Sequence, residues 1–171
     1  MSKILIKIFL MSNFLYATII NVPGDYPTIQ DAIEAGGPGV SCPGADTILV
    51  QPGSHSSFVM DNNTSSHCTF TIGSLMMTTG DTSYISSTTI DGGIIIAGKI
   101  TVSFIGLTIS GGSQDTGGGI KIGGFSSSSA ELNINNCIIS GNSANYNGGG
   151  IHLDNWCNAE IKNTLINNNS A

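Results

Sequence analysis

Apolar residues recur at a fixed spacing in the second half of the chain. Three aligned sets are separated by 30 and then 27 residues: Phe104, Ile134 and Ile161; Leu107, Cys137 and Thr164; and Ile109, Ile139 and Ile166. Two further positions, Ile120 and Ile122, return after 31 residues as Ile151 and Leu153. A period of about 20–50 residues with apolar positions in register is typical of a solenoid, in which each repeat forms one coil.

Within each repeat, two short segments alternate apolar and polar residues, namely 104–109 and 120–122 in the first copy. This period of two is typical of strands with one buried face. The segments between them are rich in Gly, Asn and Ser, which favour the sharp corners of a coil. We therefore expect an all-β fold in which like positions stack about 4.8 Å apart. Ile side chains would fill the interior, and Asn and Ser side chains would form hydrogen bonds along the corners.

One segment near the N-terminus has a helical pattern. Thr28 and Asp31 have the spacing of a capping box, and three apolar residues share one helical face: Ile29, Ala32 and Ile33. The Gly- and Pro-rich run 36–39 ends the pattern. We expect a short helix within an N-terminal segment of residues 18–40. It would cap one end of the coils formed by residues 41–171 and keep that edge from pairing with other chains.

Three segments carry a family resemblance: 22–33 (VPGDYPTIQDAI), 46–53 (DTILVQPG) and 89–92 (TIDG). They resemble the N-terminal part of right-handed parallel β-helix proteins of the pectin-lyase-like superfamily. The Gly-Asn-Ser-Ala and Gly-Gly-Gly-Ile repeats are similar to those of secreted bacterial β-helix repeat proteins and polymorphic outer-membrane proteins. The resemblance covers about residues 18–171. It implies a right-handed parallel β-helix, a fold shared by lyases, hydrolases, esterases and adhesins.

Residues 1–17 have the pattern of a secretory signal peptide. Lys3 and Lys7 precede or interrupt an apolar stretch, and Ala17 stands at a suitable cleavage position. An uncleaved membrane anchor is the alternative, although the segment is short for a span. No other run of the sequence is apolar for long enough to cross a membrane. We therefore expect the mature chain to be secreted or to lie at the cell surface or outer membrane.

The four cysteines of an exported chain allow three pairings. Cys42 and Cys68 flank a hydrophobic strand and a polar loop, and they are the candidate disulfide. Cys137 falls on an inward column, where a small buried hydrophobe is expected. A zinc site built from Cys42, Cys68, His55 and His67 is a further alternative, but these residues lack the usual C-x-x-C or H-x3-H spacing. The sequence therefore predicts no metal site and no cofactor.

The charge pattern excludes one large class of partners. The net charge is −6, only 9% of the residues are charged, and the sequence contains no arginine. A nucleic-acid-binding surface needs a basic face that neutralises phosphates. We therefore exclude nucleic acid as a partner.

The best catalytic candidates are Lys121, His152 and Asp154. Alternation directs His152 and Asp154 outward from a strand, and Lys121 aligns with His152 one repeat earlier. A carboxylate beside an imidazole is able to transfer protons. The resemblance to the pectin-lyase-like superfamily implies an active site that typically combines aspartates with an arginine or lysine. We favour the interpretation that these three residues face solvent and have no catalytic role.

Other candidates concern sugars. A glycosidase needs two carboxyl groups within about 5–10 Å, a condition that Asp154 and Glu160 meet only if a corner brings them together. Tyr146, Trp156 and Phe125 are candidates for stacking on sugar rings, with packing in a corner as the alternative for Trp156.

These observations favour a non-enzymatic function. We expect an exported cell-surface or extracellular scaffold or adhesin-like segment with no catalytic activity of its own. A polysaccharide lyase-like or hydrolase-like enzyme and a carbohydrate-binding module are the alternatives, with polysaccharides or other surface ligands as partners. The pattern stops within a repeat at residues 161–166. We therefore expect the chain to be a fragment whose remaining coils pair with its last strands.

Overall fold

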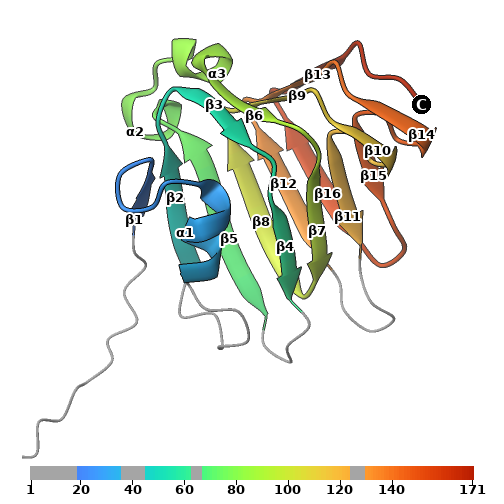
Figure 1. Ribbon diagram of the computed structural model, residues 1–171, viewed down its shortest axis with the longest axis horizontal. Coiled ribbons are helices and arrows are strands. Elements are labelled where there is room, and N and C mark those ends of the chain that lie inside the picture. The colour runs from blue at the N-terminus through green and yellow to red at the C-terminus, as the bar shows by residue number, and fades with distance from the viewer. Residues whose placement is uncertain (1–18, 36–44, 63–66, 124–129) are drawn as a thin grey trace, which may run out of the picture.

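The computed structural model describes residues 19–35, 45–62, 67–123 and 130–171. This part of the chain is mostly strand, and the strands pair in parallel within four sheets (Figure 1). The expected all-β class with parallel sheets is confirmed. The signal-peptide segment 1–17 with Ala17, as well as Cys42 and Phe125, lies outside the described residues.

Two large sheets contain eleven of the strands. Sheet A consists, in spatial order, of β1 (Ile19–Val22), β2 (Ala45–Val50), β5 (Cys68–Ser74), β8 (Ile100–Ile105), β12 (Glu131–Asn135) and β16 (Asn158–Lys162). Sheet B consists of β3 (Gly53–Ser56), β6 (Thr88–Asp91), β9 (Thr108–Ser110), β13 (Ile138–Ser140) and β17 (Leu165–Asn167). Neighbouring strands in each sheet therefore come from successive passes of the chain.

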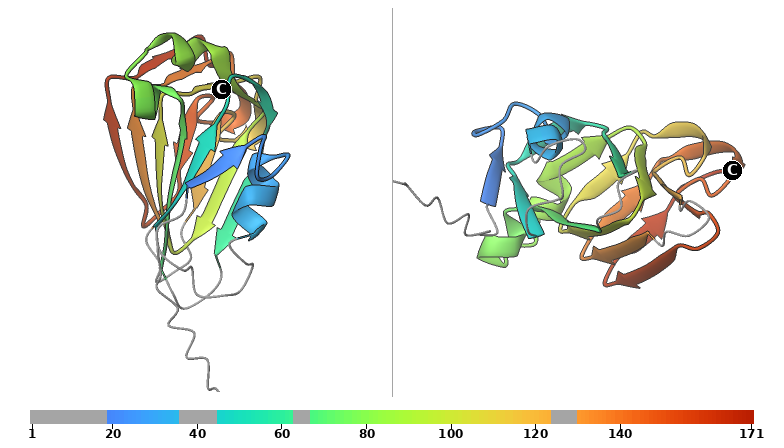
Figure 2. Two further views of the ribbon diagram at one scale, coloured as in Figure 1. Left: turned by 90° about the vertical axis from the view of Figure 1, so that its left-hand side faces the viewer. Right: turned by 90° about the horizontal axis from the view of Figure 1, so that it is seen from below.

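Two smaller sheets complete each pass. Sheet C consists of β4 (Val59–Asn62), β7 (Ile94–Gly98), β11 (Ile120–Gly123) and β15 (Ile151–Leu153), and sheet D of β10 (Ser113–Thr116) and β14 (Ser143–Asn147). The colours of Figure 2 run in order from one end of the stack to the other, because each pass lies beside the one before it. Among the described residues, none of the helices is long and apolar enough to cross a membrane.

The register of the sheets confirms the columns predicted from the sequence. Ile134 pairs with Phe104 on one side and with Ile161 on the other. Ile139 pairs in the same way with Ile109 and Ile166. Because successive side chains of a strand point to opposite faces, this register holds every apolar column on the same side of its sheet. Phe104, Ile109, Ile134 and Ile139 are at most 1% exposed and belong to one continuous core.

The corners of the stack explain the excess of Gly and Asn. One corner follows β8, β12 and β16. The residue directly after each of these strands has a positive φ: Gly106 (68°), Asn136 (54°) and Asn163 (49°). A second corner repeats the pattern with Gly111 (71°), Gly141 (68°) and Asn168 (53°). The left-handed region costs an ordinary L-residue about 1–2 kcal/mol, and Gly and Asn are the residues that visit it routinely. The composition of the repeats is therefore a backbone requirement.

Asparagine side chains link successive corners, as the sequence led us to expect. Asn142, only 1% exposed, donates from Nδ2 to the carbonyl of Ile109 at 3.1 Å and to Oδ1 of Asn169 at 3.0 Å. Asn169 in turn donates to the carbonyl of Ile139 at 2.9 Å. A buried amide without partners would cost free energy, so these bonds fix the corners against one another.

Three short helices cover parts of the stack: α1 (Ile29–Ala35), α2 (Met76–Thr79) and α3 (Ser83–Ser87). Thr28 Oγ1 accepts a hydrogen bond of 3.0 Å from the amide of Asp31 at the start of α1, and Ile29 and Ala32 are buried. The sequence pattern did not indicate α2 or α3, which lie between β5 and β6. The Met76 side chain of α2 packs over Gly106, where the virtual Cβ of a larger residue would lie 2.9 Å from Met76 Cβ.

Helix α1 also protects the free edge of sheet C. Gln30 Oε1 accepts a hydrogen bond of 2.8 Å from the amide of Val59, and its Nε2 donates to the carbonyl of the same residue at 3.3 Å. Val59 is the first residue of β4, the outermost strand of that sheet. The side-chain amide thus occupies the two backbone groups with which another strand would pair.

We predict that Asn136→Val destabilises the protein by about 1–2 kcal/mol, because a β-branched residue cannot relax at φ 54°. Asn136→Gly should be close to neutral, since Gly adopts this conformation without strain. Urea denaturation measures both. Asn133→Val, on the outward face of β12, is the control and should change the free energy of unfolding by less than about 0.5 kcal/mol. Equal losses in both valine variants would contradict the corner argument.

We predict that Gln30→Ala lowers the free energy of unfolding by about 1 kcal/mol, because two partly solvated hydrogen bonds are lost. The Val59 amide should exchange faster with solvent. Gln30→Glu, which keeps the acceptor and removes the donor, should retain part of the protection of that amide. Unchanged exchange of Val59 in Gln30→Ala would show that the helix does not cover this edge.

Candidate functional site

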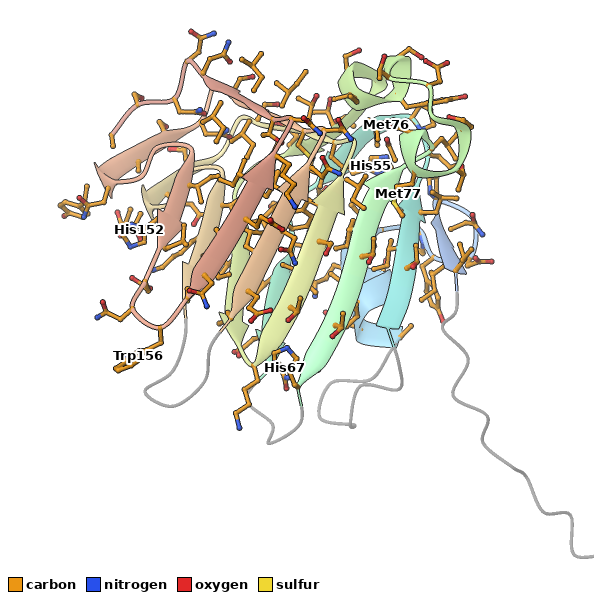
Figure 3. All side chains as sticks on the ribbon, turned by 180° about the vertical axis from the view of Figure 1, so that it is seen from behind. His55, His67, Met76, Met77, His152 and Trp156 are labelled. Atoms are coloured by element: carbon orange, nitrogen blue, oxygen red, sulfur yellow. The ribbon has the colours of Figure 1, made fainter. Side chains whose placement is uncertain are left out.

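The structure brings two of the three catalytic candidates into contact. His152 lies in the middle of β15, and Asp154 follows the strand directly. The His152 Nε2 and Asp154 Oδ1 atoms are 3.0 Å apart, and the side chains are 22% and 46% exposed. Lys121 is the register partner of His152 on β11. Figure 3 shows His152 pointing outward from the stack. The pair can exchange a proton, but it lies on an open outer surface.

The two carboxylates considered as a glycosidase pair are engaged separately. Asp154 contacts His152, whereas Glu160 forms an ion pair of 2.7 Å with Lys162 on β16. The Glu160 and Lys162 side chains are 62% and 61% exposed. Each carboxylate thus already has its own basic partner at the surface.

Two of the three aromatic candidates, Tyr146 and Trp156, are largely exposed to solvent. Tyr146 on β14 is 71% exposed, and Trp156, in the turn between β15 and β16, is 70% exposed. Trp156 also has a φ of 67°, a conformation that is uncommon for a bulky residue. In Figure 3 its ring lies at the tip of this turn, away from the sheets. Packing in a corner, the alternative considered from the sequence, does not describe this side chain.

The two histidines considered as part of a zinc site lie apart. Figure 3 shows His55 and His67 at opposite ends of the strands. The Nε2 atom of His55 lies 2.8 Å from the carbonyl of Gln51, and that of His67 lies 2.8 Å from Thr101 Oγ1. Cys68 is disulfide-bonded, so its sulfur is not a thiolate ligand. Within the described ranges, no group of three or more metal-binding side chains is present.

Cys137 is a free thiol. Cys137 is buried in the core, as its inward column predicted. Burial in apolar surroundings raises the pKa of the Cys137 thiol from 9.0 to about 11. A thiol with so high a pKa is almost entirely protonated at neutral pH, and it is therefore not a nucleophile.

The outward face of sheet A carries a hollow that the sequence reasoning missed. It lies over three neighbouring strands and is lined by Ser103, Phe104, Ile105, Asn133, Ile134, Asn135, Glu160 and Lys162. The register places Ser103, Asn133 and Glu160 in one outward column, and Ile105, Asn135 and Lys162 in the next. The 30- and 27-residue spacings predict these outward columns as well, but our sequence-based predictions considered only the inward, apolar positions.

A chain of hydrogen bonds crosses the same face near the start of the strands. His67 Nε2 contacts Thr101 Oγ1 at 2.8 Å, and Thr101 Oγ1 donates to Glu131 Oε2 at 3.2 Å. The hydroxyl stands between the imidazole and the carboxylate. In a nucleophilic triad the imidazole must stand in the middle to take the proton of the hydroxyl. The arrangement therefore ties adjacent strands together and does not activate Thr101.

Comparison of the chain with protein-family models, curated proteins and solved structures finds no match in any of the three. The functions of the candidate residues are therefore inferred from their positions and contacts in this structure.

We predict that Cys137 resists alkylation by iodoacetamide at pH 8 in the folded protein, because its thiol is buried and its pKa is about 11. It should react readily in urea, where the pKa returns toward 9.0. Peptide mass mapping measures both states. Cys137→Ala is the control that assigns the signal. Rapid labelling of Cys137 in the native protein would contradict its burial in the core.

Proposed function

We propose that the chain is a segment of a right-handed parallel β-helix of the pectin-lyase-like superfamily, exported from the cell. It serves as a surface scaffold or adhesin-like segment without catalytic activity of its own. In this proposal α1 caps one end of the solenoid. Four parallel sheets whose neighbouring strands come from successive passes support the fold assignment, together with the motifs at 22–33 and 46–53.

One observation carries the non-enzymatic assignment. Several outward columns of sheets A and B are built mainly from Ser, Thr and Asn, as in the column of Thr71, Ser103 and Asn133. The strongest acid–base pair, His152 with Asp154, stands at the surface with 22% and 46% of the side chains exposed. Electrostatic catalysis depends on preorganised groups in a site from which water is excluded. A surface rich in hydroxyl and amide groups is suited to a scaffold or to an adhesin that contacts other molecules.

The location at the cell surface is part of the same proposal. It rests on the pattern of Lys3, Lys7 and Ala17 in the leader. The disulfide of Cys68 fits an oxidising compartment, because disulfides are rare in the reducing cytosol.

A carbohydrate-binding or carbohydrate-active function is the second candidate, favoured by the hollow on sheet A. Asn133, Glu160 and Lys162 there offer hydrogen-bond donors and acceptors side by side. Sugar hydroxyls are bound by such polar groups, and an exposed aromatic ring such as that of Trp156 would provide a stacking surface.

We predict that the full chain, expressed in a secreting bacterial host, is exported and begins at Thr18 after processing. The variant Lys3→Glu/Lys7→Glu should remain inside the cell, because the leader loses its positive end. N-terminal sequencing and protease digestion of intact cells measure this. The purified chain should release no product from a panel of polysaccharides. Turnover that falls in Glu160→Gln but not in Asp115→Asn would instead support the second candidate.

A further inference from the structure

A short apolar strip interrupts the polar outer face of sheet A. It consists of Leu49 on β2, Gly73 on β5 and Ile105 on β8, which are register partners in one outward column. The same column carries Asn21 on β1 and Asn135 on β12. Leu49 is nevertheless only 9% exposed, although its side chain lies outside the continuous core. A cover on the outer face of the sheet must therefore exclude water from this strip.

Helix α2 supplies this cover through Met77. A Cβ at Gly73 would overlap Met77 Sδ, and it would lie 2.8 Å from Met77 Cγ and from the carbonyl oxygen of Ile105. The thioether therefore rests directly on the Gly73 backbone, in the middle of the apolar strip. Figure 3 shows Met77 on this face, near the end of β5. The flexible, polarisable side chain of methionine is suited to filling such a gap.

The three methionines of the described residues differ in access and in contact. Met76 and Met77 are partly exposed, whereas Met60 on β4 is only 1% exposed. Met76 covers Gly106 with its stem: a virtual Cβ there would lie 2.9 Å from Met76 Cβ and 3.1 Å from its Sδ. Met77 instead contacts Gly73 most closely through its sulfur. Met77 thus combines access to solvent with a sulfur that holds α2 on the sheet.

We propose that Met77 is a site of reversible oxidation by hydrogen peroxide, and that its sulfoxide releases α2 from the apolar strip. A lone pair of the thioether sulfur attacks one peroxide oxygen, so an S–O bond forms and the O–O bond breaks. The sulfur is oxidised by two electrons and the peroxide is reduced. The displaced hydroxide takes up the remaining peroxide proton and leaves as water. Methionine sulfoxide reductases reverse this change.

The sulfoxide fits the strip poorly. Its oxygen accepts hydrogen bonds and donates none, and the nearest backbone oxygen at Gly73 is the carbonyl of Ile105, which is an acceptor as well. A polar group held against apolar residues without a partner costs free energy. Helix α2 is a single turn of four residues, so it can move without breaking a strand pair. Its release uncovers Leu49 and Ile105 beside the hollow that Ile105 helps to line.

Peroxide treatment of the full chain tests the proposal. Peptide mass mapping should show that Met77 is oxidised at least about tenfold faster than Met60 in the folded protein, because burial excludes the oxidant from Met60. The two rates should be equal in urea. Subtilisin should then cleave the oxidised chain at residues 75–82 at least about tenfold faster, because α2 no longer packs on the sheet. The dye ANS should bind the uncovered strip, and circular dichroism should show that the sheets persist.

Two variants assign the effect to one sulfur. Met77→Leu keeps an apolar side chain over Gly73 and has no sulfur there to oxidise, so it should fold normally. Peroxide should change neither its cleavage by subtilisin nor its binding of ANS. Met76→Leu retains Met77, and it should respond to peroxide as the unaltered chain does.

Any of three results would overturn the proposal. One is equal oxidation rates of Met77 and Met60 in the folded chain. Another is oxidation of Met77 that leaves α2 as resistant to subtilisin as before. The third is a Met77→Leu variant that responds to peroxide like the unaltered chain. The proposal does not rest on the scaffold function, which export and the lack of turnover test separately.

Discussion

Parallel backbone pairing between passes about 30 residues apart is the interaction on which the rest of the structure depends. In sheet A it sets Phe104, Ile134 and Ile161 in one column. A slip of one residue would turn each apolar column toward solvent, so the hydrophobic core and the backbone register stabilise each other. The core is continuous along the stack because every pass adds its inward residues at the same positions.

The corners follow from this constraint. A pass can return to the same register only if the chain bends sharply between strands, and Gly106, Asn136 and Asn163 provide that bend with positive φ. Differences in repeat length are placed in connecting segments, where no ladder is disturbed. The Gly-Gly-Gly runs at 117–119 and 148–150 also lie between strands, at a corner of each pass. Gly118 has no room for a side chain, because a Cβ there would approach the carbonyl oxygens of Ser143 and Gly149.

The sequence predicted the apolar columns and helix α1, and it missed the elements that have no apolar pattern. The apolar columns, the inward Cys137 and the outward His152 could be derived from spacing alone. Helices α2 and α3 make local contacts, such as Met76 over Gly106 and Thr108 Oγ1 donating to the carbonyl of Ile85, that have no periodic signal. Sheet D escaped prediction because Ser113–Thr116 has no buried face. The hollow on sheet A arises between residues of three passes, so it becomes visible only when the outward columns are read together.

In-register stacking also explains why charges are scarce. Like positions of successive passes lie about 4.8 Å apart, so a charge repeated in a column would meet itself at every rung. In the paired positions of the described sheets, charged residues of one sign are never direct neighbours: Glu131 lies between Thr101 and Asn158, and Lys121 between Ile95 and His152. Hydroxyls and amides avoid this repulsion while keeping the surface polar.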